Sequence, residues 1–209
     1  MAKFRNPGLI GLAAGMALLA CAGVAAVSAA ERSGPTYTAD GKLIFPKDYR
    51  SWPWLSSGFD MSYVAGAPSD MHVFDNVFVN PDAYAAFQAT GTWPDKTVMV
   101  LEVRKAEQNG SINKSGRFQT AMTGAEIHIK DTARFKGGWA FFGFNGNGPG
   151  QLAPPTAACY SCHAQHAAVD TTFVQFYPTL LPIAQAKGTL SPAYQAEEAA
   201  RAKIPVSNH

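Results

Sequence analysis

The amino-acid sequence predicts an α+β fold, a mainly antiparallel β-sheet with flanking helices. Strand-like segments follow one another through the middle of the chain and are joined by short turns, which favours antiparallel pairing. Helical segments follow the strands, and one of them carries Cys159-Tyr160-Ser161-Cys162-His163. Another begins at Ser191-Pro192, where serine is a good N-cap and proline suits the first turn. The motif is therefore expected on a C-terminal helix beside the sheet.

A strand and a helix open the pattern. Residues 73–79 are rich in valine and phenylalanine, as β-strands are, and they end at Asn80-Pro81. Asn80 can cap a helix that has Pro81 at its first position and ends at Gly91. The further strand segments are 97–104, 117–123, 125–130 and 138–144, with a hairpin signal at Asn109-Gly110.

The N-terminus has the features of an export signal. Lys3 and Arg5 precede an uncharged run over 9–30, and the small residues before position 31 provide a signal-peptidase site near Ala29 or Ala30. A membrane anchor ranks second, because the run is rich in alanine and glycine rather than in leucine and isoleucine. We therefore predict a signal peptide over 1–30 and a periplasmic location.

Lipidation at Cys21, after Leu18-Leu19-Ala20, is the minority alternative for the N-terminus. Cleavage after Ala30 instead removes Cys21 and two basic residues, leaving fifteen basic and fifteen acidic residues. This balance gives no electrostatic reason to expect nucleic acid as a partner. About 180 residues remain, which suits one domain over 31–209 with its core over roughly 48–181. The polar stretch 31–49 is expected to be a peripheral arm.

The Cys-x-x-Cys-His motif is the strongest functional signal. At this spacing, two thiols add to one haem and the next histidine reaches its iron. A zinc site would need further Cys or His ligands, and a thioredoxin-like dithiol would need a strand before the motif. We therefore predict one haem c, attached covalently through Cys159 and Cys162, with His163 as the metal ligand.

Other side chains are weaker candidates for roles at the haem. The conceivable sixth ligands are Met71, His72, Met99, Met122 and His128, although buried methionine usually fills a core. His128 lies in an alternating strand and is expected to be exposed, and His166 is expected to be solvated. Phe74 and Phe78 are predicted to cover the distal haem face. Arg104, Arg117 and Arg134 are candidate partners of the haem propionates.

Four stretches carry a resemblance to a known family: Asn76-Val77-Phe78-Val79-Asn80-Pro81, 97–100, 138–142 and the segment from Cys159 to Pro178. On these residues the chain is similar to the cytochrome P-460 and cytochrome c′-beta superfamily, over roughly 48–181. The resemblance implies an antiparallel sheet with flanking helices, a homodimer and a pentacoordinate haem with an open distal face. Members are associated with hydroxylamine oxidation or with binding nitric oxide.

Two departures from the family pattern bear on function. The hydroxylamine-oxidising members link a lysine to the haem edge, and this chain has Leu101 at the matching position. Lys105 lies four residues further, more than ~12 Å along an extended strand. Asp75 stands where those members carry an arginine. Acids on candidate strands that could accept a proton are Asp75, Glu102 and Glu126.

The sequence therefore favours a periplasmic mono-haem cytochrome that binds or scavenges a small diatomic or nitrogenous ligand such as nitric oxide. In this interpretation a redox partner protein supplies electrons to the haem, and the cytochrome can also take part in electron transfer. One alternative is an oxidoreductase that acts on hydroxylamine. The other is a six-coordinate electron carrier, which would need a strong second axial ligand that the sequence does not supply.

Overall fold

The computed structural model describes residues 34–63, 71–144 and 148–203. The predicted signal peptide over 1–30, with Cys21, lies outside these ranges. Within them, no helix is both long enough and apolar enough to span a bilayer.

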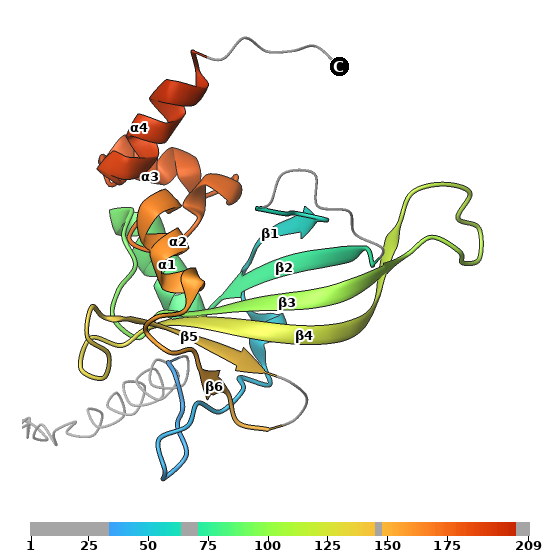
Figure 1. The fold of residues 1–209 in the computed structure, drawn as a ribbon, viewed down its shortest axis with the longest axis horizontal. Helices are drawn as coiled ribbons and strands as arrows, with labels where there is room; N and C mark the ends of the chain where they lie inside the picture. The colour runs from blue at the N-terminus through green and yellow to red at the C-terminus, as the bar shows by residue number, and fades with distance from the viewer. Residues whose placement is uncertain (1–33, 64–70, 145–147, 204–209) are drawn as a thin grey trace, which may run out of the picture. The chain divides into compact units, whose positions relative to one another are not determined.

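A six-stranded antiparallel sheet organises the described chain, with the strands in sequential order (Figure 1). The strands are β1 (Trp54–Phe59), β2 (Val73–Val79), β3 (Val98–Glu107), β4 (Phe118–Lys130), β5 (Trp139–Phe144) and β6 (Gln151–Leu152). Every neighbouring pair is antiparallel, including β2 and β3, which a helix connects. The predicted fold class is confirmed.

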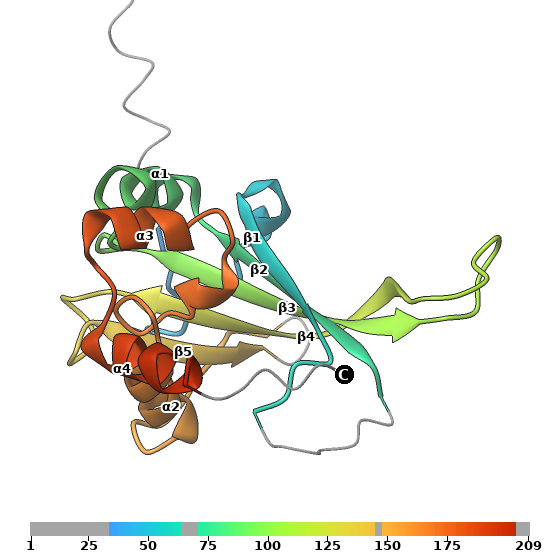
Figure 2. The ribbon, with the colours of Figure 1, turned by 90° about the horizontal axis from the view of Figure 1, so that it is seen from above.

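Four α-helices flank the sheet: α1 (Pro81–Thr90), α2 (Ala158–His166), α3 (Leu181–Lys187) and α4 (Pro192–Arg201). Two short 3₁₀ helices, η2 (Tyr49–Ser51) and η3 (Val174–Phe176), complete the described elements. Figures 1 and 2 show the four helices near one end of the long strands, while the β3–β4 hairpin projects from the other end. The Cys-x-x-Cys-His motif lies on α2.

Three local features differ from the sequence-based expectation. Strand β1 has no counterpart in the predicted pattern, and the two segments 117–123 and 125–130 form one strand. Asn80 is at the N-cap of α1, but its side chain makes no capping bond. Its Oδ1 instead accepts a hydrogen bond from the Val98 N–H at 2.8 Å, which ties the start of α1 to β3.

The two faces of the sheet have different surroundings. Leu101 pairs with Val77 of β2 and with Glu126 of β4, so these three side chains share a face, which we call the cavity face. The next residue, Glu102, pairs with Asn76 and points to the opposite face, which we call the filled face. The filled face carries a core of buried residues: Leu43, Tyr49, Trp52, Val98, Val100, Ala125, Ile127, Ile129, Ala140, Phe142 and Phe144.

The N-terminal stretch is part of this core and not a peripheral arm. Leu43 and Tyr49 are only 1% and 4% exposed. The Leu43 carbonyl accepts a hydrogen bond from the Gly150 N–H at 2.9 Å, and Phe45 packs edge-on against Phe144. The expectation for 31–49 failed because scattered apolar residues in a polar stretch can still cover a sheet face.

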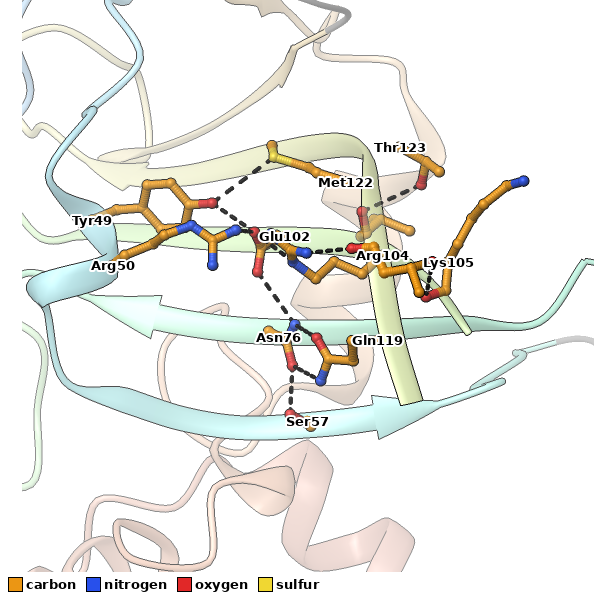
Figure 3. A network of polar contacts seen from close by, with 12 residues as sticks. Tyr49, Arg50, Ser57, Asn76, Glu102, Arg104, Lys105, Gln119, Met122 and Thr123 are labelled. Carbon is orange, nitrogen blue, oxygen red and sulfur yellow. Dashed lines mark hydrogen bonds and ion pairs between the residues drawn. The ribbon is translucent and has the colours of Figure 1, made fainter. Parts of the chain in front are cut away.

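A buried carboxylate organises the polar part of the filled face (Figure 3). Glu102 is 1% exposed and forms ion pairs with Arg50 and with Arg104 Nε, the latter at 3.0 Å. It also accepts hydrogen bonds from the Tyr49 hydroxyl at 2.7 Å and from Asn76 Nδ2 at 3.3 Å. Burial and the bond to Glu102 raise the pKa of Tyr49 to about 12. Two guanidinium groups thus compensate the buried charge.

Candidate functional site

A cavity of about 410 Å³ lies between the cavity face and the segments that follow β6. Its walls come from β1 to β5, from α2 and from the segment that contains η3. The lining residues are Ser56, Gly58, Met61, Tyr63, Asp75, Val77, Met99, Leu101, Glu126, Ile127, His128, Phe141, Ala158, Cys159, Cys162, His163, Thr172, Phe173, Phe176 and Tyr177. Its volume is within the range of cofactor sites, and apolar side chains predominate.

Helix α2 brings the whole motif to this cavity. Cys159, Cys162 and His163 all line it, and both cysteines are free thiols. Residues three and four apart on a helix share a face, so the motif spacing presents these three side chains together. Tyr160 fixes the helix to the sheet, because its hydroxyl accepts from the Phe141 N–H at 3.4 Å and donates to the Ala153 carbonyl at 3.3 Å.

His163 is oriented by a hydrogen bond from its other ring nitrogen. Nδ1 lies 2.7 Å from the Thr171 carbonyl oxygen, which can only accept, so Nδ1 carries the proton. The remaining nitrogen, Nε2, then keeps its lone pair for a metal. Burial lowers the pKa of His163, opposed in part by the Thr171 bond, and so favours the neutral ring that a metal needs.

His128 is placed differently from the sequence-based expectation. The residue is 9% exposed, and its ring stacks on Phe141 at 4.0 Å between ring centroids. It also contacts the His163 ring edge-on at 5.1 Å. Burial, with the proximity of His163, holds the pKa of His128 well below its usual range. The expectation of exposure was wrong because both faces of β4 are covered. Helices cover the face that carries His128, and the core of the filled face covers the other.

The other candidate sixth ligands divide into two groups. Met99 lines the cavity and is 4% exposed, within the apolar core beside it. Met122 lies near the Tyr49 hydroxyl and His72 pairs with Asp60, and neither is among the residues that line the cavity. Met71 also lies outside the cavity lining. His166 is half exposed and pairs with Glu197, as expected of a solvated histidine.

Phe74 and Phe78 do not line the cavity, which corrects the prediction that they cover a haem face. Both are even-numbered residues of β2, and the cavity-facing residues of that strand, Asp75 and Val77, are odd. Phe78 packs edge-on against Tyr49 on the filled face, and Phe74 packs against Phe59. A strand alternates its side chains, and the sequence did not show which set faced the cavity.

Other aromatic side chains take their place. Phe141 and Phe173 line the cavity and contact the His163 ring at 4.6 and 4.2 Å between centroids. Phe176, Tyr63 and Tyr177 also reach the lining. None of these five side chains was singled out for the haem from the sequence, and only Phe141 lies in a segment with a strand pattern. The others follow the motif or precede β2, in segments with no periodic pattern to place them.

Leu101 lines the cavity, and Lys105 does not. Leu101 lies on the cavity face of β3, whereas Lys105 is exposed near the far end of that strand. In the described part of the chain, no lysine or arginine side chain contributes to the cavity wall. Arg104 is committed to Glu102, and Arg134 stacks on Tyr37 and donates to the Gly41 carbonyl. Arg117 is likewise absent from the lining.

The three acids named from the sequence are separated by the sheet. Asp75 and Glu126 line the cavity, while Glu102 is on the filled face. Burial, the charge of Glu126 and the charge of Asp60 raise the pKa of Asp75. Carboxylates close to one another and far from cations hold protons more tightly. The cavity thus combines an apolar wall with two acidic side chains.

The donor set and the lining of the cavity fit a c-type haem. Two free thiols and a histidine with an available Nε2 lie on its wall, and aromatic and aliphatic side chains supply an apolar lining. Sequence reasoning missed Thr171, whose carbonyl orients His163. Thr171 lies in the Asp170-Thr171-Thr172 run just after the motif. Nothing in the local periodicity distinguishes this run from an ordinary loop.

One protein-family model, described as Cytochrome P460, matches residues 46–174. This range is more than half of the chain and includes all six strands, β1 to β6, and the whole motif. None of the curated proteins matches the chain. The match agrees with the cavity, in which a Cys-x-x-Cys-His helix faces the sheet. The chain belongs to the cytochrome P460 family, and it is accordingly a haem-binding cytochrome with a c-type haem cofactor.

Proposed function

We propose that this protein is a periplasmic mono-haem cytochrome that binds small neutral ligands such as nitric oxide. Its haem is attached through Cys159 and Cys162, and His163 is its axial ligand. The observation that carries the proposal is the 2.7 Å bond between His163 Nδ1 and the Thr171 carbonyl, which leaves Nε2 free inside the cavity. When bound, the haem supplies an iron whose second axial position can accept a ligand.

The chain's own side chains support an open second position. His128, the other histidine on the cavity wall, bonds through Nε2 to the Thr171 hydroxyl at 3.2 Å. Because both imidazoles bind the same residue, His128 and His163 lie on the same side of the site. Met99 is held in the apolar core. The cavity therefore favours five-coordinate iron over the six-coordinate electron carrier.

The charge of the cavity favours a neutral ligand. Asp75 and Glu126 are on its wall, and no described lysine or arginine accompanies them. Carboxylates in a partly dry cavity repel anions and leave neutral diatomic molecules unaffected. The aromatic side chains around His163 exclude water from the same region. A neutral gas is thus the ligand class that the wall accommodates best.

Hydroxylamine oxidation is the second candidate, and the two acids are the observation that favours it. Asp75, with its raised pKa, can accept or return a proton at the cavity wall. Against it stands Leu101, because leucine cannot form the link to the haem edge that the oxidising relatives use. The proposal of a ligand-binding cytochrome therefore ranks first. Its proposed partners are a second copy of the chain, in a homodimer, and a redox protein.

Absorption spectra of the ferrous protein test the proposal. We expect an ordinary c-type Soret band in the unmutated protein, and a change in that band when nitric oxide is added. His163→Ala should keep the haem stain on a denaturing gel but alter the ferrous spectrum, since covalent and axial bonds come from different residues. A band shifted far to the red, with a lysine-containing haem peptide by mass spectrometry, would restore the enzymatic candidate. An unaltered spectrum in His163→Ala would show that another residue is the axial ligand.

A further inference from the structure

The segment that follows the motif helix is held in place on both sides of Thr171. Asp170, which has a positive φ of 53°, accepts an ion pair from Lys130 Nζ at 3.1 Å. Thr172 accepts a hydrogen bond from the Trp93 indole N–H at 2.8 Å and is 1% exposed. Thr171 therefore sits between two fixed residues. Its backbone carbonyl is the group that orients His163.

Thr171 has its own contact with the sheet. Its Oγ1 lies 3.2 Å from Nε2 of His128, a residue of β4. The same residue thus bonds to one histidine through its hydroxyl and to the other through its carbonyl. The His128 ring has little freedom to move, because it is stacked on Phe141 with an interplanar angle of 11° and contacts the Trp139 ring at 4.4 Å between centroids. The sheet therefore reaches the motif histidine through a short chain of contacts.

We propose that His128 is a positioning residue for the axial ligand: it holds Thr171, whose carbonyl in turn orients His163 and sets how strongly that ring donates to the iron. This inference rests on the proposed function, in which His163 is the axial ligand. It adds a residue outside the Cys-x-x-Cys-His motif to the determinants of the redox and ligand-binding properties of the haem.

The physical basis is general for histidine ligands. In a metal-bound imidazole, the nitrogen that does not bind the metal often donates a hydrogen bond to a carbonyl, which fixes the ring and raises its basicity. Loss of such a partner typically costs about 10–100-fold in metal affinity or activity. A loosened Thr171 carbonyl would weaken this bond. The imidazole would then donate less charge, the oxidised state of the iron would be less stabilised, and reduction would become easier.

Two other roles for His128 make different predictions. If His128 is only an aromatic filler, phenylalanine at this position keeps the stacking on Phe141 and should leave the haem unchanged. If His128 is a sixth ligand, its replacement should change the coordination number. The positioning role predicts instead an unchanged coordination number with an altered bond between iron and His163.

The test uses the full haem-loaded protein and four substitutions. His128→Phe and Thr171→Val remove the hydrogen bond while keeping volume, and His128→Gln and Thr171→Ser retain a polar partner. We expect the first pair to change the oxidised-to-reduced ratio at fixed potential about tenfold, which is about 59 mV for one electron. The iron–histidine stretching band in resonance Raman spectra of the ferrous protein should fall in the same two variants. His128→Gln and Thr171→Ser should stay close to the unmutated protein.

The double variant and two controls complete the design. His128→Phe with Thr171→Val should shift the potential no more than either single change, because both remove the same contact. His166→Gln, on the exposed side of α2, should shift nothing. Loss of the Raman band in His163→Ala, with no shift in His128→Phe and Thr171→Val, would overturn this inference alone. A band that survives His163→Ala would overturn the proposed axial ligand itself.

Discussion

A glutamate has different surroundings on the two faces of the sheet. Glu102 and Glu126 come from adjacent strands, and Glu126 pairs directly with Leu101, the residue before Glu102. Glu102 is 1% exposed and is compensated by two arginines, whereas Glu126 faces the cavity and makes no ion pair within the described part of the chain. A shift of one residue along a strand thus separates a structural carboxylate from one that a ligand can meet.

The apolar side chains show the same division. On the filled face, Val100 and Ile129 are completely buried, and each such side chain contributes about 2 kcal/mol to stability. On the cavity face, Phe141 and Phe173 line a space of about 410 Å³ that the chain leaves open. The chain covers the filled face with its own side chains, whereas the cavity face carries a core around Val79 and Met99 and, beside it, a space that a cofactor can occupy.

The largest expected effect is at the cavity itself, on the motif helix that faces the sheet. The double variant Cys159→Ala, Cys162→Ala should lose all haem that resists denaturation, because each thioether bond uses one thiol. Haem staining of denatured protein and acid–acetone extraction measure this loss. Haem that stayed with the double variant through extraction would show that the attachment is not through this pair.

The next prediction compares matched changes on the two faces. Glu102→Gln should lower the free energy of unfolding by about 3 kcal/mol, because it leaves the charges of Arg50 and Arg104 uncompensated. This value is at the low end for a broken buried ion pair, because the Arg50 side chain is half exposed. Glu126→Gln should change stability by less than about 0.5 kcal/mol. Urea unfolding followed by circular dichroism measures both. Equal costs on the two faces would contradict the division drawn above.

Ligand binding should show the reverse order. Glu126→Gln should tighten binding of azide, an anion, to the ferric protein about fivefold, because one negative charge leaves the cavity wall. Nitric oxide binding should be unchanged in the same variant, and Glu102→Gln should alter neither. Spectrophotometric titration with each ligand provides the measurement. If azide affinity did not respond to Glu126→Gln, the charge of the cavity would not select among ligands.

The smallest effect concerns the pH dependence of stability. The raised pKa of Asp75 means that the folded protein holds this proton more tightly than the unfolded chain does. Its contribution to the free energy of unfolding therefore falls as pH rises from about 3.9, the ordinary Asp value, through the folded pKa. Asp75→Asn should be more stable than the unmutated protein at neutral pH and equal to it below that range. Urea midpoints between pH 3.5 and 7 test this, and a constant difference across the range would contradict it.

The fold class, the family and the motif could all be predicted from the amino-acid sequence. Alternating strands joined by turns predict antiparallel pairing wherever they occur, and Cys159, Cys162 and His163 are fixed at ligand spacing by helix geometry alone. These features are local, so they survive without knowledge of the rest of the chain. Leu101 could also be placed at the cavity, because its position relative to the family pattern did not depend on packing.

The side chains that meet at the cavity could not be predicted in this way and became visible in the folded chain. Phe74 and Phe78 were assigned to the cavity and lie elsewhere, because alternation along β2 is equally consistent with either face. His128 and Thr171 are 43 residues apart in the sequence and meet because β4 and the segment after α2 pack together. Such contacts depend on long-range packing, which leaves no periodic signal in the sequence.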